Sequence, residues 1–515
     1  MKRFQYIIIC SIFFQIVLLG CPTYSRLFSA NLNTISNDSI MDGSIFELDD
    51  ILLDSVYPEA SIKPTDIPVT NNNYSHSLKL HYTANNPNTP DFLIITPQSL
   101  YDSIHKEIKT YAEDLHTIYG FGIYIETVEN ENAGLLKSLI NNYQKNLYGV
   151  FLIGDLSECM FEIEKDYNNN VYGYKKWPCD LFYMDLNGNW SDTDTNGVLD
   201  THIGDVAPDI VFGRLSATGL SSLGSEVSLI RKQLHKSHNF WWKSSFHSAD
   251  TVLNYIYKDW LHRFQSNYIA SVFSTGLVDD IRNVSGSPFS KSDYLNRLSL
   301  SQYGFVHLAA HSSPTLHTFK EDGGYIYLHE ISESVLNNKC LAYNLFCCSA
   351  CNWLAASSQG YLGGIYLFNN GRTLSVVGST KTGSMLYSNL FYSYLSTRNI
   401  GEAFRDWWRT ELGNSNTVNT ISWNYGLTIL GDPMINFRHQ VSDFCVANLT
   451  LTSFPPNNFS NLVMFKAGNS IKVTDSFIIP QGTHVIFDAP QVYFEKGFTC
   501  PTGASFETRH EGCEL

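Results

Sequence analysis

Two apolar runs near the middle of the chain each lead to a side chain that can do nucleophilic or acid–base chemistry. The run FVHLAAHSS contains His311, and the run LAYNLFCCSAC ends at Cys351. A thiol with its ordinary pKa of roughly 8.5 is only a few per cent thiolate at neutral pH, and a nearby imidazole can take its proton. Parallel strands bring their carboxyl ends to one edge of a sheet, where such groups can meet. We therefore predict that His311 and Cys351 face each other, in the arrangement that a cysteine peptidase uses.

Three thiols crowd the second run, at positions 347, 348 and 351. Side chains alternate between the faces of a strand, so Cys347 and Cys351 would share one face and Cys348 would take the other. Cys351 is the thiol nearest the following loop, and we predict it as the exposed nucleophile. The C-x-x-C pair of Cys348 and Cys351 is also typical of a redox pair or half a metal site, but no second ligand pair of comparable spacing follows. For each residue alone, a purely structural role is the simpler alternative.

Strand-like and helix-like segments alternate from residue 91 onwards and would position these side chains. Buried strand patterns occur at 92–95, 123–128, 148–153 and 374–378. Helical patterns cover 100–117, 133–143, 217–241, 250–270, 361–369, 384–394 and 400–412. A strand and a tight turn at 425–437 close the domain. This alternation predicts an α/β domain with a mainly parallel sheet flanked by helices and joined by right-handed crossovers.

An Asp-rich loop in the first half of this domain resembles part of a calcium-binding loop. The stretch DTDTNGVLD carries side-chain oxygens at Asp192, Asp194 and Asn196, followed by a glycine. A calcium loop of this type also needs a bidentate Glu at its twelfth position, which is absent here, and Asp200 and Asp205 are the candidates to replace it. A solvated Asx-rich turn is the alternative. We predict a structural Ca²⁺ site at Asp192, Asp194, Asn196 and Asp200.

The composition of the chain changes near residue 443, and residues 443–515 are strand-like without helical periodicity. The segment FIIPQG at 477–482 recurs as FTCPTG at 498–503, an offset of 21 residues. A proline and a glycine that recur at this spacing indicate stacked β rungs. The sequence therefore predicts a small all-β module at the C-terminal end.

Charge and cysteine usage limit the classes of partner and compartment. The chain has 515 residues with a formal net charge of −15, which argues against nucleic acid as a partner. Its 43% hydrophobic residues can fill a large core, and length allows two or three domains. The chain has eleven cysteines, of which 159, 179, 445, 500 and 513 could form disulfides in an exported protein. Their pairing does not follow from the sequence.

The first 21 residues have the pattern of a secretory signal. A basic start precedes an apolar run from Tyr6 to Leu19, and Leu18-Leu19-Gly20-Cys21 resembles a lipobox, whose cysteine would be acylated. Cleavage just after Cys21 without lipidation is the alternative. Residues 22–88 are rich in Ser, Asn, Asp and Pro and are predicted to be a leader or pro-segment. No later run is long and apolar enough to cross a bilayer. We expect an exported protein, extracellular or at the cell surface, which is either anchored to the outer membrane by a lipid on Cys21 or cut just after Cys21 and freely secreted.

Several blocks taken together resemble the gingipain-type cysteine peptidases, family C25 of the caspase-like clan. The resemblance covers roughly residues 90 to 440 and assigns residues 89–442 to a caspase-like catalytic domain. In chain order, the blocks are DFLIITP, YGVFLIGD, PCDLFYMDLNG, DIVFGRLS, HLAAHSSP, FCCSACNW, LSVVGSTKTGS, GEAFRDWW and YGLTILGDPMINF. Each block alone is weak, whereas the ordered set is specific.

The resemblance implies a set of roles within an endopeptidase that needs no cofactor for catalysis and acts on proteins or peptides. His311 would be the general base and acid, and Cys351 the nucleophile that forms a thioester. The backbone N–H of Ser312 would help to bind the oxyanion, although the family usually has glycine there, and Asp180 would line a pocket selective for basic residues. Two rivals remain open: a catalytically inactive peptidase-like protein used for binding or surface adhesion, and a disulfide or metal protein built on the cysteine cluster.

Overall fold

The computed structural model describes residues 79–82 and 89–513, apart from short gaps. These gaps are at 168–171, 244–245, 247–248, 265–268, 274–275, 301, 320–323, 439–444, 455–461 and 475. The predicted signal segment, its lipobox cysteine and most of the predicted leader lie outside the described residues. Within the described part, no helix combines the length and the apolar character that a membrane span requires.

An eleven-stranded sheet forms the centre of the α/β domain. In spatial order its strands are β1 (Lys79–Tyr82), β3 (Gly122–Val128), β2 (Asp91–Pro97), β4 (Leu147–Ile153), β9 (Val211–Leu215), β18 (Leu427–Gly431), β17 (Ser375–Ser379), β16 (Ala342–Phe346), β12 (Tyr303–Ala309), β10 (Thr251–Ile256) and β11 (Leu277–Arg282). Every residue of β12 and β16 is buried. Strands buried on both faces are expected in parallel sheets covered by helices, and they explain the continuous apolar runs of the sequence.

The sheet consists of two parallel halves that run in opposite directions. In the first half-sheet, β3, β2, β4, β9 and β18 are parallel to one another. In the second half-sheet, β17, β16, β12, β10 and β11 are parallel to one another. The halves meet where β17 pairs antiparallel with β18. The carboxyl ends of β10, β12, β16 and β17 therefore share one edge, and those of β2, β3 and β4 lie at the opposite edge.

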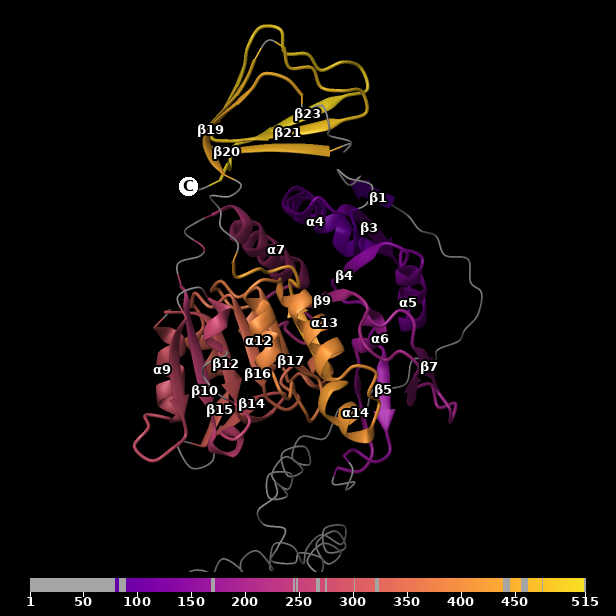
Figure 1. The fold of residues 1–515 in the computed structure, drawn as a ribbon, viewed down its shortest axis with the longest axis vertical. Coiled ribbons are helices and arrows are strands. Elements are labelled where there is room, and N and C mark those ends of the chain that lie inside the picture. The colour runs from indigo at the N-terminus through magenta and orange to yellow at the C-terminus, as the bar shows by residue number, and fades with distance from the viewer. Residues whose placement is uncertain are drawn as a thin grey trace, which may run out of the picture. The chain divides into compact units, whose positions relative to one another are not determined.

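Helices surround this sheet, and α12 and α13 lie in front of it in Figure 1. The helices are α4 (Gln98–Tyr119), α5 (Ala133–Asn141), α6 (Leu181–Met184), α7 (Glu226–Trp242), α9 (Lys291–Ser299), α10 (Leu328–Ser334), α11 (Leu362–Leu367), α12 (Asn389–Leu395), α13 (Ile400–Glu411) and α14 (Val418–Asn424). Local signals set their ends. Asn399 begins α13 by accepting a hydrogen bond from the Glu402 N–H, and α4 ends at Gly120, whose φ of 72° suits glycine.

Three small sheets lie in the loops of the domain. They are formed by β5 (Met160–Ile163) with β6 (Lys175–Pro178), by β7 (Asn189–Ser191) with β8 (Thr201–Ile203), and by β13 (His311–Ser313), β14 (Leu316–Phe319) and β15 (Gly324–Tyr327). The predicted α/β class, with a mainly parallel sheet flanked by helices, is confirmed.

Two segments differ from the sequence-based prediction. Residues 250–270, predicted to be helical, contain strand β10 and the short 3₁₀ turn η3 (Lys258–Trp260). The apolar run TVLNYI is too short for its periodicity to distinguish a strand from a buried helix. Residues 79–82, assigned to the leader, form the edge strand β1, which pairs antiparallel with β3.

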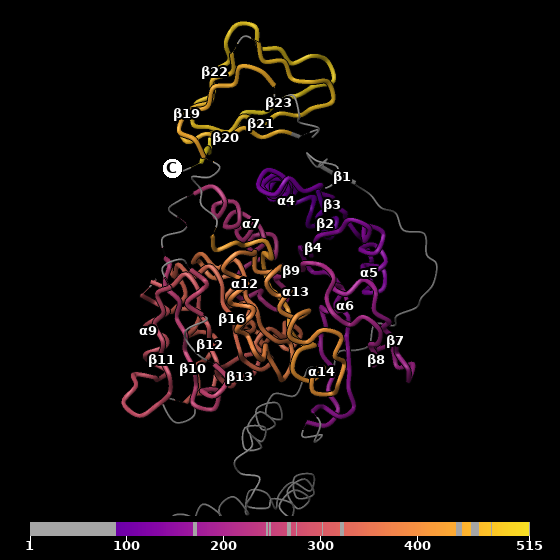
Figure 2. Tube along the Cα trace, viewed as in Figure 1, coloured from indigo at the N-terminus to yellow at the C-terminus, as the bar shows by residue number. Residues whose placement is uncertain are grey.

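The C-terminal module is all-β and has its own small core. Its strands are β19 (Val446–Leu451), β20 (Leu462–Val473), β21 (His484–Asp488), β22 (Gln491–Phe494) and β23 (Ser505–Arg509), and their pairings are parallel. Figure 2 shows the module as successive turns of chain. In the register of β21 with β23, Val485 pairs with Phe506, an offset of 21 residues. The same offset relates the N–H of Gly482 to the carbonyl of Gly503, 2.8 Å away. The repeat in the sequence thus corresponds to stacked rungs.

Ion pairs hold the module against α4 and α7, and one disulfide joins the two ends of the module. Arg509 Nη1 lies 2.7 Å from Glu113 Oε2, and His238 Nε2 lies 3.3 Å from Glu511 Oε2. A disulfide joins Cys445 to Cys513. Of the other candidates for pairing, cysteines 159, 179 and 500 are free thiols in the structure.

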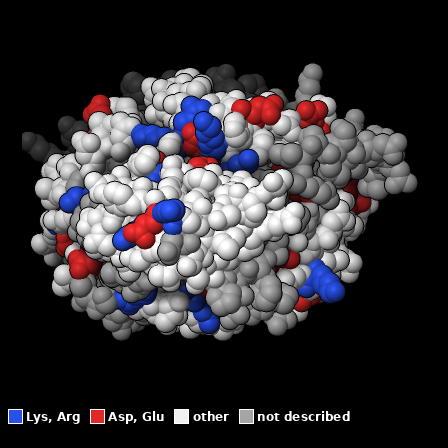
Figure 3. All heavy atoms as spheres, turned by 90° about the horizontal axis from the view of Figure 1, so that it is seen from above, with Lys and Arg blue, Asp and Glu red and all other residues white. Residues whose placement is uncertain are grey.

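The charged residues are sparse on the face shown in Figure 3. Lys and Arg are interspersed there with Asp and Glu in small mixed groups, and wide uncharged areas separate them. This distribution matches the low charged fraction of 16%.

Candidate functional site

Three neighbouring strands of the second half-sheet lead to a carboxylate, an imidazole and a thiol. Asp259 lies in η3 just after β10, His311 follows β12, and Cys348 follows β16. The last matched pair of β12 and β16 is Ala309 with Phe346, so His311 and Cys348 each stand two residues beyond it. Because these strands are parallel, all three side chains belong to the same edge of the sheet.

Asp259 orients the imidazole of His311. Its Oδ2 lies 2.9 Å from His311 Nε2, and the two side chains are 10% and 0% exposed. A carboxylate can only accept in this pair when it is ionised, so Nε2 carries the hydrogen and Nδ1 is the nitrogen suited to exchange a proton with a thiol. The rings of Tyr257 and Trp260 pack against the imidazole at centroid distances of 5.8 and 5.4 Å. The hydrogen bond to Asp259 and these aromatic contacts all hold the imidazole in place.

Cys348 lies at the exit of β16 and is tied to the histidine loop. The Ser312 hydroxyl donates to the carbonyl oxygen of Cys348 at 2.5 Å. The next residue, Ser349, has a φ of 54°, a left-handed conformation that non-glycine residues rarely adopt. Such turns persist where the surrounding structure imposes them, often beside functional groups. Cys348 is 8% exposed, against 1% for Cys347 and 0% for Cys351.

Cys351 does not occupy the exposed position that the sequence analysis expected. Its Sγ packs so closely on two glycines that an added Cβ would lie 2.6 Å from it at Gly378 and 2.9 Å at Gly363. Burial raises the pKa of the Cys351 thiol, and nearby Cys347 raises it further. The physical reason is the early end of β16: the strand stops at Phe346, so the chain has already turned when it reaches Cys351. The geometry therefore disfavours Cys351 as a nucleophile.

The neighbours of the histidine loop are also buried. Ser312 is 1% exposed within β13, and its backbone is not among the residues with positive φ, so the position has no need of glycine. His317 is fully buried on β14, with its Nε2 3.1 Å from the Tyr366 hydroxyl. Burial lowers the pKa of His317 to about 3, which keeps this imidazole neutral. His317 thus has a structural setting.

Asp180 is engaged in a buried ion pair and presents no oxygen to a substrate. Its Oδ1 lies 2.7 Å from Arg214 Nη2, both side chains are 1% exposed, and the Thr428 hydroxyl donates to Oδ2 at 2.6 Å. Burial lowers the pKa of Arg214, but the charge and the hydrogen bonds of Asp180, with smaller contributions from Tyr183 and Glu158, together leave the pKa raised. This geometry does not support the predicted pocket for basic residues. The sequence could not show the ion pair because Arg214 lies 34 positions away.

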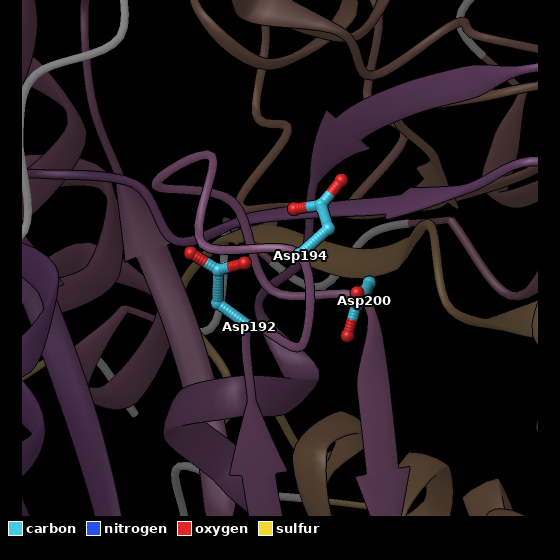
Figure 4. A group of neighbouring side chains, drawn as sticks. All are labelled: Asp192, Asp194 and Asp200. Carbon is cyan, nitrogen blue, oxygen red and sulfur yellow. The ribbon is translucent and has the colours of Figure 1, made fainter.

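The Asp-rich loop between β7 and β8 brings three of its four predicted calcium ligands together (Figure 4). Carboxylate oxygens of Asp192, Asp194 and Asp200 lie within 4.8 Å of one another. Asn196 differs, because its amide nitrogen donates to Glu162 at 2.6 Å while its oxygen accepts from the Val198 N–H. Backbone N–H groups already bind the carboxylates: Thr193 donates to Asp200 and Gly197 to Asp192. The loop therefore has the grouped negative charge that a cation site needs, and it also has the hydrogen bonds of an Asx turn.

Asp259 is the residue that the sequence analysis missed. Its signal was present, since YKD directly follows the apolar run TVLNYI. Because residues 250–270 were predicted to be helical, Asp259 was not expected at the end of a strand. A carboxylate inside a helix would not be predicted to lie beside the strand that leads to His311.

A separate cavity of about 480 Å³ lies at the opposite edge of the sheet. Residues that follow β2, β3 and β4 line it, including Gln98, Glu129, Glu131 and Asp155. Asp259, His311 and Cys348 lie at the other edge, in the second half-sheet. The cavity is therefore separate from this group of three residues.

A comparison with protein-family models matches residues 85–438 to peptidase family C25. The chain belongs to peptidase family C25. The match covers the α/β domain from just before β2 to just after β18 and confirms the resemblance drawn from the sequence blocks. A comparison with curated protein sequences finds no match. As a C25 enzyme, the protein is a cysteine peptidase that hydrolyses peptide bonds, and its substrates are proteins or peptides.

Proposed function

We propose that this C25 peptidase is an exported endopeptidase in which Cys348 is the nucleophile, His311 the general base and acid, and Asp259 the residue that orients His311. The observation that carries the proposal is the placement of these residues after three adjacent parallel strands, with His311 Nε2 2.9 Å from Asp259. Cys348 replaces Cys351 in this proposal because Cys351 packs against Gly363 and Gly378 in the core.

The reaction would proceed in two halves. His311 Nδ1 takes the proton of the Cys348 thiol, and the thiolate attacks the peptide carbonyl. The C–N bond then breaks as the imidazolium returns a proton to the leaving amine, which leaves a thioester on Cys348. In the second half, His311 removes a proton from water, the resulting hydroxide attacks the thioester, and the acid product leaves with the thiol restored. The ionised Asp259 stabilises the imidazolium in both halves.

Backbone N–H groups are the proposed donors to the oxyanion. Those of Cys348 and Ser312 are suited by position, because the Ser312 hydroxyl holds the two loops together at the Cys348 carbonyl. The ordinary φ of Ser312 supports its use in place of glycine. Loss of one such donor commonly lowers kcat by ~10²–10³.

Export and calcium binding complete the proposal. The basic start and apolar run before Cys21 support export, with lipidation at Cys21 as the means of anchoring to the outer membrane. The grouped carboxylates of Asp192, Asp194 and Asp200 support a structural Ca²⁺ ion. The mass of the mature N-terminal peptide decides between an acylated Cys21 and a freely secreted chain.

The decisive experiment compares the two thiols. We expect Cys348→Ala to lower kcat by roughly 10⁴-fold or more, since nucleophile and base act as a unit. Cys351→Ala should retain kcat and lose about 1 kcal/mol of stability through lost packing. Labelling with a peptide that carries an electrophilic warhead, followed by peptide mapping, should place the label on Cys348. Full activity in Cys348→Ala, with the label on Cys351, would overturn the assignment.

A further inference from the structure

A buried lysine stands at the carboxyl end of the next strand along the same edge. Lys381 follows β17, which pairs with β16, and it is 3% exposed. Its Nζ donates to Asp166 Oδ1 at 3.1 Å and lies 3.0 Å from Oδ2. It also donates to the carbonyls of Thr382 at 2.6 Å and Ser422 at 2.7 Å. An ammonium group with its hydrogen bonds satisfied in this way has no hydrogen left for a substrate.

The backbone of Lys381 fixes the turn that carries Cys348. The N–H of Ser349 donates to the Lys381 carbonyl at 2.9 Å, and the Ser379 hydroxyl donates to the same oxygen at 2.9 Å. A second bond links the loops, from the N–H of Cys351 to the Ser379 carbonyl at 2.9 Å. The left-handed conformation of Ser349, next to the thiol, is thus held from the Lys381 loop.

The surroundings of Lys381 keep water away from its charge. The ammonium lies 5.3 Å from the ring centroid of Tyr167 and 5.0 Å from that of Trp177, distances typical of cation–π contacts. Burial lowers the pKa of Lys381, while the charges of Asp166 and of Cys348 raise it and that of Lys175 lowers it. The charged groups that act on this lysine are therefore Asp166, Cys348 and Lys175. The Lys381 loop adjoins the Cys348 turn through the Ser349 N–H, and a cation near a thiol in a poorly solvated site favours the thiolate.

We propose that Lys381 is a positioning residue for the nucleophile, which holds the Cys348 turn through its carbonyl and favours the Cys348 thiolate through its ammonium group. This inference rests on the proposed function, in which Cys348 attacks the substrate. The proton of the thiol still passes to His311, and Lys381 neither gains nor loses a proton. Asp166 keeps the lysine charged and in place.

Two charge variants separate this electrostatic role from a structural one. The double variant Lys381→Met with Asp166→Asn removes both charges and leaves no unpaired buried ion. Asp166→Asn alone removes the carboxylate that keeps the buried lysine charged, and leaves the two carbonyl partners of the lysine in place. Lys236→Met is the matched control. Lys236 is also buried, and its ammonium group also donates to backbone carbonyls, one of which belongs to Asn369.

The readout is the rate at which iodoacetamide alkylates Cys348 as a function of pH, measured on the full chain by peptide mapping. We expect the double variant to raise the midpoint of this pH profile by about one unit, the effect of a lost opposite charge, and Lys236→Met to leave it unchanged. Asp166→Asn should also raise the midpoint, because the lysine then loses the carboxylate that keeps it charged. A double variant with the wild-type midpoint, or an equal rise in Lys236→Met, would overturn the proposal.

The proposed function is tested separately by kcat in Cys348→Ala. If that variant stays active while the double variant still shifts the midpoint, the lysine acts on Cys348 but the catalytic assignment fails. If Cys348→Ala is inactive and the midpoint does not move, the catalytic assignment stands and the role of Lys381 fails.

Discussion

At the scale of single residues, the choice among neighbouring thiols depends on where a strand ends. The chemistry of the three thiols is the same at Cys347, Cys348 and Cys351. The alternation of side chains along a strand assigns each cysteine to one face of the sheet only if the strand continues through all three. Because strand β16 ends at Phe346, the cysteine that lies where the chain leaves the strand is Cys348 rather than Cys351. His311 was predictable because a histidine directly after a buried strand has few other reasons to be there. The partner of Asp180 was not, because an ion pair between distant segments leaves no local pattern.

The hydrogen bond between Asp259 and His311 leads to a prediction about catalysis. Asp259→Asn keeps the shape of the side chain but replaces an acceptor-only group with an amide, which does not stabilise an imidazolium and can select the wrong tautomer. We expect kcat to fall by roughly 10²-fold or more, with little change in melting temperature. Steady-state kinetics on a peptide substrate measures this effect.

A matched carboxylate on the adjacent strand provides the control for Asp259. Asp280 on β11 pairs with Arg282 at 2.8 Å, within the same half-sheet. Asp280→Asn should retain wild-type kcat. Equal losses in the two variants would mean that Asp259 acts only through the fold.

At the scale of elements, the sequence predicted most of the strands that are buried on both faces and misjudged β10. The continuous apolar runs of β2, β4 and β12 have no solvent-facing residues to interrupt them, so they were recognisable. Strand β10 has six residues, and its run TVLNYI continues into an aromatic loop that extends the apolar pattern to helical length. The change of strand direction between the half-sheets, at β17 and β18, was also not predictable from the sequence, because strand direction depends on pairing rather than on composition.

The loop between β7 and β8 yields a prediction about calcium. A cation that binds only the folded state raises the melting temperature by mass action. We expect millimolar Ca²⁺ to raise the melting temperature relative to excess chelator, and the variant Asp192→Asn with Asp194→Asn to lose this difference. Differential scanning calorimetry measures the shift, and Mg²⁺ serves as the control ion because it prefers tight octahedral sites. Identical scans with Ca²⁺ and chelator would leave the loop as an Asx turn.

At the scale of the whole molecule, one buried carboxyl group couples stability to pH. Asp432 follows β18 and is 1% exposed, and its Oδ1 accepts from the Tyr111 hydroxyl of α4 at 2.7 Å. Burial raises the pKa of Asp432 from 3.8 to about 6, although its hydrogen bonds lower it. The folded state therefore binds the proton more tightly than the unfolded state. The stabilisation that this gives is complete below pH 3.8 and is lost as the pH rises through about 6.

This coupling predicts that Asp432→Asn stabilises the protein at neutral pH. Asparagine keeps an oxygen for the Tyr111 hydroxyl and removes the buried charge, which is worth roughly 2 to 3 kcal/mol at this shift. We expect the variant to melt above the wild type at pH 7.5 and to approach it at pH 4.5. Asp102→Asn, on the exposed side of α4, should change neither value. A variant that melts lower than wild type by the same amount at both pH values would show that the hydrogen bonds of Asp432 outweigh its charge.

The stability of the C-terminal module depends on a disulfide whose pairing the sequence left open among five cysteines. The disulfide between Cys445 and Cys513 spans 68 positions, and a loop of this length stabilises by about 4 kcal/mol through the entropy of the unfolded chain. We expect the double variant Cys445→Ser with Cys513→Ser to become sensitive to limited trypsin digestion within residues 446–513, while the catalytic domain stays intact. Cys500→Ser is the control, because Cys500 is a free thiol and its loss should leave the module resistant. Because Glu511, whose side chain is 64% exposed, also pairs with His238 of α7, the digestion should be faster at high salt, which weakens exposed ion pairs more than buried ones. Equal resistance of the double variant and Cys500→Ser at low and high salt would mean that the packing of the rungs alone holds the module together.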